Sequence, residues 1–157
     1  MTVNMDPWRF EVDLERTMEH SRKLSQDHCE CGYCRNYYQS INTVLPSLEA
    51  FLSRFGVKIS APVELMPIEP TLYLLGYRVY GNVKRMSDRL IYVDGVPIRI
   101  SPEAGDRFRL EFGPIVLPWV VDEDPEDVIS PANEPEFMDQ MYKKLLMLSQ
   151  PFDVVTS

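Results

Sequence analysis

All three cysteines of the chain lie within six residues, at Cys29, Cys31 and Cys34, directly after His28. The other histidine, His20, lies eight residues before His28. Cysteine thiolates and imidazole nitrogens are donors that zinc prefers, and a tight turn can bring three thiols with this spacing onto one ion. The segment therefore predicts a metal site with zinc as its cofactor, and the candidate ligands are Cys29, Cys31, Cys34, His28 and His20.

The fourth ligand of such a site is the open question. His28 is adjacent to Cys29, and side chains of neighbouring residues diverge, whereas His20 has to fold back onto the turn. The chain also has no second CxxC pair of the kind found in zinc ribbons.

Two other interpretations fit the same residues. Cys31 and Cys34 form a CxxC pair near the start of a predicted helix, where the helix dipole lowers a thiol pKa and favours redox chemistry. However, Arg22–Asp27 is not the apolar strand that precedes such a pair in thioredoxin-like proteins. The third interpretation is that the cysteines are small packing residues at a helix start.

Hydrophobic alternation indicates strands, and apolar residues spaced three and four apart indicate helices. The chain accordingly predicts an α+β fold, an antiparallel sheet of about five to seven strands with a helical hairpin and a C-terminal helix packed on it. Asp94-Gly95 indicates a type I′ hairpin turn, and Gly113-Pro114 indicates another turn. The expected strands are residues 8–15, 63–68, 71–83, 89–93, 96–100, 107–112 and 115–121.

The helical hairpin is expected directly after the cysteines. Apolar residues from Tyr37 to Leu45 form one stripe, Pro46 ends the first helix, and Ser47 can cap a second helix that closes at Gly56. Residues 16–30 are polar and indicate a short helix or a loop.

We expect a single domain over residues 1–157, with a core of about residues 8–121, an acidic connector at 122–132 and a C-terminal helix at about 134–149. The apolar face of that last helix carries Met138, Met141 and Met147 and serves the core or a homodimer interface.

The sheet residues suggest one further site. A small anion pocket could lie at Arg78, Arg99 or Arg109, but no glycine-rich phosphate loop supports it. Strand alternation places Tyr73 and Tyr77 on the opposite face from Arg78, which predicts core tyrosines and solvated arginines.

Composition narrows the function classes. The net charge of −8 disfavours nucleic acid as a partner, and no apolar run is long enough for a membrane span. An odd number of cysteines without a secretory signal predicts a cytoplasmic protein.

The segments CECGYCRNYY, FLSRFGVKISAPVEL, LYLLGYRVYGNV and PIVLPWVVDED, in this order, resemble a family of uncharacterised bacterial proteins that carry CxCxxCRN(F/Y) and PWVLDE motifs. The resemblance covers residues 8–124 and departs at Leu75, where the family has glycine, and in the short stretch between Arg107 and Pro118. It implies a single domain and supplies no reaction. The matched motif positions are Cys29, Cys31, Cys34, Arg35, Asn36, Tyr37, Pro118, Trp119, Asp122 and Glu123.

These observations predict a non-enzymatic binding or scaffold domain whose cysteine-rich turn holds a structural zinc. The alternative is a thiol-based redox enzyme or sensor that uses the CxxC pair.

Overall fold

The computed structural model describes residues 1–27, 29–69 and 71–124. It has the expected α+β architecture, with three helices and a seven-stranded antiparallel sheet. The predicted C-terminal helix, most of the acidic connector and His28 lie outside the described residues. The elements are β1 (Thr2–Met5), β2 (Trp8–Val12), α1 (Leu14–Gln26), α2 (Gly32–Val44), α3 (Leu48–Ser53), β3 (Glu64–Glu69), β4 (Leu72–Arg85), β5 (Ile91–Val93), β6 (Val96–Pro102) and β7 (Arg107–Val116).

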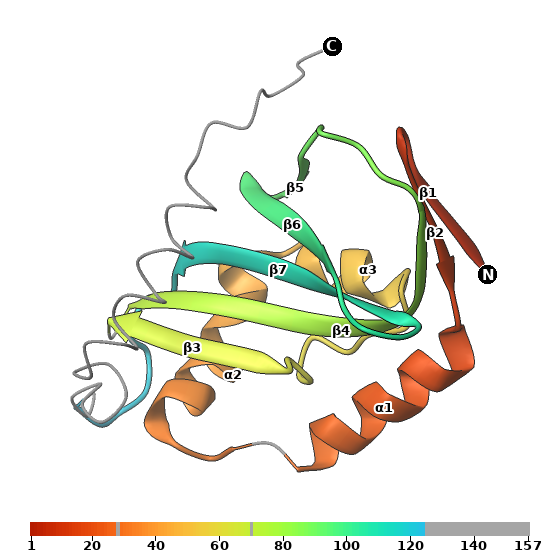
Figure 1. The fold of residues 1–157 in the computed structure, drawn as a ribbon. Coiled ribbons are helices and arrows are strands. Elements are labelled where there is room, and N and C mark those ends of the chain that lie inside the picture. Colours follow the sequence, from red (N-terminus) through yellow and green to blue (C-terminus); the bar gives the residue numbers. More distant parts are fainter. Residues whose placement is uncertain (28, 70, 125–157) are drawn as a thin grey trace.

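The 14-residue strand β4 organises the sheet (Figure 1). One edge of β4 pairs with β3 over its first half and with β2 over its second half, and β1 continues the sheet beyond β2. The other edge pairs with β7, which is followed by β6 and β5. The helices α2 and α3 lie behind β4 and β7 in this view, so the opposite face of these strands carries no helix among the described residues.

The core fills the space between the sheet and these two helices. Phe10 of β2 packs against Phe55 and Phe108, with ring centroids 5.2 Å and 5.4 Å apart. Tyr73 and Tyr77 of β4 are fully buried, which confirms the predicted core tyrosines. Burial of each such aromatic side chain stabilises the fold by about 1.5–3 kcal/mol. This burial holds α2 and α3 against one face of the sheet.

The Asp94-Gly95 turn between β5 and β6 is confirmed, with φ of 49° and 81° at its two residues. Its aspartate also contacts the helical hairpin, because Asp94 accepts hydrogen bonds from the amide and the hydroxyl of Ser47. Ser47 precedes α3 as predicted, but its hydroxyl does not cap the helix. Ser47 instead links the start of α3 to the β5–β6 turn through these two hydrogen bonds.

Three local predictions were wrong. Leu14 begins α1 instead of ending a strand, because Asp13 caps that helix by accepting the amide hydrogen of Arg16. Gly113-Pro114 does not end a strand either: β7 passes through it, with two residues opposite Leu74 alone in a bulge. Residues 117–121, predicted as strand, are irregular.

The edge of β4 between its β3 and β2 partners is contacted by the buried Thr17 of α1. The Thr17 hydroxyl accepts the amide hydrogen of Tyr80 at 3.0 Å and donates to the Tyr80 carbonyl at 3.3 Å. The amide of Asp13 donates to that same carbonyl. A helix side chain therefore satisfies the strand backbone where no strand pairs with Tyr80 on this edge.

Candidate metal centre

The cysteine turn connects α1 to α2. Cys31 is the N-cap residue of α2, with an extended backbone, and Cys34 lies one turn later on the helix. Residues three apart on a helix start face the same side, and Cys29 folds back onto them. The three Sγ atoms consequently lie within 4.8 Å of one another. Cys29 and Cys31 are exposed, and Cys34 is half-buried.

The three thiols have different environments. The Cys31 amide donates a hydrogen bond to Cys29 Sγ at 3.4 Å, and this bond lowers the pKa of the Cys29 thiol below its ordinary value. Burial, with a further contribution from the neighbouring thiols, raises the pKa of Cys34. The Cys29 thiol therefore loses its proton more readily than the Cys34 thiol. Binding of a cation by thiolates releases protons.

The two predicted histidine ligands have different outcomes. His28 lies outside the described residues. His20 is not among the donors gathered at the turn. Its ring packs edge-on against Tyr80 of β4, with centroids 5.2 Å apart, and its Nε2 atom is buried without a hydrogen-bond partner in the described part of the chain. The structure thus brings together three of the five predicted ligands.

His20 makes stability depend on pH. Burial, assisted by the charges of Arg78, Arg107 and Lys23, holds the pKa of His20 below its ordinary value of 6.5. The unfolded chain therefore binds a proton at mildly acidic pH that the folded protein does not, and stability falls as pH falls below that value. In urea unfolding at about pH 7.5 and about pH 5.5, we expect His20→Gln to lose less stability on acidification than the wild type. Equal losses in the two proteins would contradict this assignment.

The segment after β7 packs on the start of α2, next to the cysteine turn. Asn36 of α2 is fully buried, and its side-chain oxygen accepts the amide hydrogen of Val120 at 2.7 Å. Its side-chain amide donates to the Tyr73 hydroxyl at 3.3 Å. Trp119 packs edge-on against Tyr33, at 5.4 Å between centroids. The side-chain amide of Asn36 thus links α2 to β4 and to the segment after β7.

Charged groups reinforce this junction. Arg35 forms an ion pair with Glu123, and its Nε donates to the Glu30 carbonyl within the cysteine turn. The Glu123 carboxylate lies above Gly32, where a Cβ atom would be 3.0 Å from its oxygen. Composition and periodicity gave no sign of these contacts. The only signal was the joint occurrence of the CRN and PWVVDE motifs, which meet here.

The arrangement can hold a soft cation on three thiolates and can attach two distant segments of the chain to that site. Among the described residues, no helix is both long and apolar enough to cross a membrane. Comparison of the chain with protein-family models, with curated proteins and with solved structures finds no significant match.

Proposed function

We propose that the protein is a non-enzymatic binding or scaffold domain in which Cys29, Cys31 and Cys34 bind one zinc ion. The proximity of the three thiols carries the proposal. Zinc–sulfur bonds of about 2.3 Å in a tetrahedral site place two sulfurs about 3.8 Å apart, and the three Sγ atoms already lie within 4.8 Å of one another. A small contraction of the turn is enough to bind the ion.

The position of the site supports a structural role for the metal. The turn begins α2, and the residues that follow Cys34 contact β4 and the segment after β7. A bound ion would fix the N-terminus of α2 and, with it, the Asn36 and Arg35 contacts. We retain His28 as the candidate fourth ligand, since the ring of His20 packs against Tyr80.

Zinc content and stability test the proposal. We expect the purified full-length protein to carry about one zinc per chain by elemental analysis, and a chelator to lower its free energy of unfolding by roughly 2–3 kcal/mol. Cys31→Ser should abolish stoichiometric zinc and lower stability, although serine is the better helix N-cap. A loss in this variant therefore reports the missing ligand.

Glu30→Gln is the matched control, because it alters an exposed side chain of the same turn without removing a thiol. It should keep its zinc and its stability within about 0.5 kcal/mol. A wild-type protein that binds no zinc and is indifferent to chelator would overturn the proposal.

Thiol redox chemistry is the second candidate, favoured by the lowered pKa of Cys29 and by the position of Cys31 at a helix start. Zinc-free protein with one thiol that is alkylated rapidly near neutral pH, and a loss of that reaction in Cys29→Ser, would replace the scaffold function with this one. Slow alkylation of all three thiols in zinc-free protein would exclude it.

A further inference from the structure

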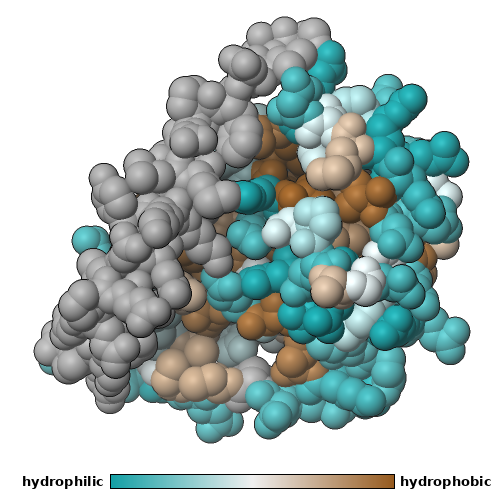
Figure 2. All heavy atoms as spheres, viewed as in Figure 1, coloured by the Kyte–Doolittle hydropathy of each residue, from teal (hydrophilic) through white to brown (hydrophobic). Residues whose placement is uncertain are grey.

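The face of the sheet opposite α2 and α3 concentrates arginines in an otherwise acidic protein. Arg107 and Arg109 alternate along β7, and the register places Arg78 of β4 directly opposite Arg109. Like charges in opposed positions repel one another. Figure 2 shows this side of the molecule, where hydrophilic residues alternate with hydrophobic patches on the described surface. The cluster of Arg78, Arg107 and Arg109 therefore needs negative charge nearby.

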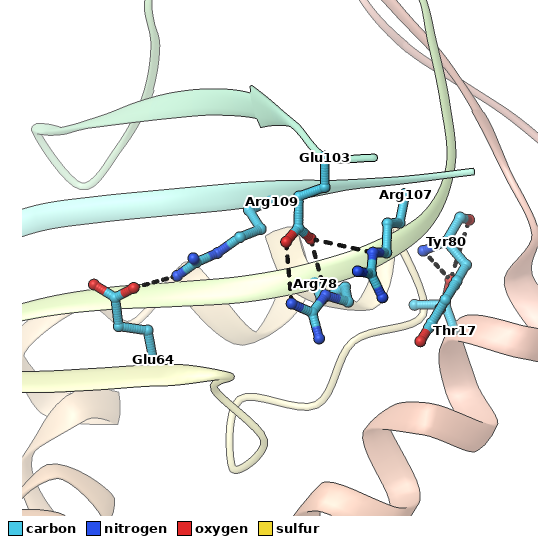
Figure 3. Close-up of polar contacts among 7 residues, drawn as sticks. All are labelled: Thr17, Glu64, Arg78, Tyr80, Glu103, Arg107 and Arg109. Atoms are coloured by element: carbon cyan, nitrogen blue, oxygen red, sulfur yellow. Dashed lines mark hydrogen bonds and ion pairs between the residues drawn. The ribbon is translucent and has the colours of Figure 1, made fainter. Parts of the chain in front are cut away.

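Two carboxylates meet part of this need (Figure 3). Glu103 accepts two hydrogen bonds from Arg78, at 2.8 Å and 3.0 Å, and these bonds hold the pKa of Glu103 below its ordinary value. Glu64 of β3 forms an ion pair with Arg109. The guanidinium of Arg109 lies across Gly76, where a Cβ atom would be 2.5 Å from Nη2. The glycine thus leaves room for a charged group against the backbone of β4.

Arg107, the third arginine, forms a longer ion pair with Glu103 (Figure 3) and has no carboxylate at hydrogen-bond distance among the described residues. Its Nε atom is 4.0 Å from Glu103 Oε1, beyond hydrogen-bonding range. Within the described residues, the Nε atoms of Arg107 and Arg109 and the Nε2 atom of His20 are all buried without a hydrogen-bond partner. Buried polar atoms of this kind ordinarily have partners. Because an arginine Nε–H can only donate, the two arginine atoms point to a missing acceptor.

We propose that Arg78, Arg107 and Arg109 form a binding site for a phosphate group on the face of the sheet opposite α2 and α3. The three guanidinium groups share two carboxylates, so the cluster carries an excess positive charge. A carboxylate ligand offers two coplanar oxygens and matches one arginine fork, as Glu103 already does for Arg78. A phosphate group has oxygens that diverge in three dimensions and can reach arginines on two strands. Arg107 has the most exposed side chain of the three, at 39%, and receives the ligand from solvent.

Titration of the full-length protein with sodium phosphate, followed by backbone amide NMR, tests the site. We expect shifts at Arg78 and residues 107–109 that sodium chloride and sodium acetate at equal ionic strength do not produce. Arg107→Gln should weaken phosphate binding by about tenfold or more, the loss expected for one charge-assisted hydrogen bond. Arg107→Lys keeps the charge, and its affinity for phosphate should lie between those of the wild type and Arg107→Gln.

Arg99→Gln is the matched control, because β6 and β7 place Arg99 opposite Glu111 on the same face. It removes the same charge outside the cluster and should change phosphate affinity by less than about twofold. A parallel titration with a phosphate monoester identifies the source: tighter binding than inorganic phosphate indicates a phosphorylated molecule, and equal binding indicates the free ion. Shifts equal to those from chloride or acetate, or equal weakening in Arg107→Gln and Arg99→Gln, overturn the proposal.

Discussion

Gly81→Ala should be the most damaging single-methyl substitution on the sheet, with an expected loss of about 3–5 kcal/mol in the free energy of unfolding. Gly81 has a φ of 149°, and a Cβ atom there would lie 2.2 Å from the Glu11 carbonyl oxygen and 2.9 Å from Val12 Cα. Both contacts are with the backbone of β2, which pairs with β4 at this residue. Neither atom can rotate away, so the two strands have to separate. Urea unfolding measures the loss.

Gly105→Ala provides the control for backbone conformation. Gly105 also has a positive φ, of 83°, but a Cβ atom there would meet nothing within 4 Å. This substitution should cost only the conformational strain, about 1–2 kcal/mol. Equal losses at the two positions would show that the close approach of β2 does not require glycine.

Asn36→Ala should have the second-largest effect, a loss of about 2–4 kcal/mol. The substitution removes the acceptor of the Val120 amide and the donor to Tyr73, and it leaves a small cavity at a fully buried position. The amide of Val120 should then exchange with solvent faster, since it loses its hydrogen bond. Hydrogen exchange by NMR reports that local change, and urea unfolding reports the loss of stability.

Asn42→Ala is the matched control, because Asn42 is exposed on the same helix. Both substitutions gain the same helix propensity, so the difference between them measures the buried hydrogen bonds. Asn42→Ala should leave stability within about 0.5 kcal/mol of the wild type or raise it slightly, and should not change exchange at Val120. Equal stability and equal exchange at Val120 in the two variants would contradict the role proposed for Asn36.

Local sequence signals predicted most elements of the fold. Asp94-Gly95 needs only its own two residues to adopt a positive φ, and the apolar stripe of α2 repeats within one helix, so both were found. Gly113-Pro114 was misjudged because its conformation depends on pairing with β4, against which β7 places its extra residue in a bulge. Helix α1 was only partly recognised, since most of its residues are polar and its two buried residues are a threonine and a serine.

In the candidate site, too, the local features could be predicted from the sequence and the contacts between distant segments could not. The three thiols are close in sequence, so their proximity in space was predicted. The contacts of Asn36 join residues 84 and 37 positions apart, and no periodicity within a segment reports such a pair. The arginine cluster likewise depends on the register that sets Arg78 opposite Arg109. Sequence reasoning named both arginines without being able to place them together.

The contact between Thr17 and Tyr80 bears on how the protein avoids association with other chains. Unpaired backbone groups on a strand edge are a template for the addition of a foreign strand, which is a route to aggregation. At Tyr80 that template is occupied by the Thr17 hydroxyl, which both accepts and donates, and by the amide of Asp13, which donates to the same carbonyl. The protein thereby blocks strand addition at the middle of β4, the longest strand of the described residues, with the start of α1 and without another strand there.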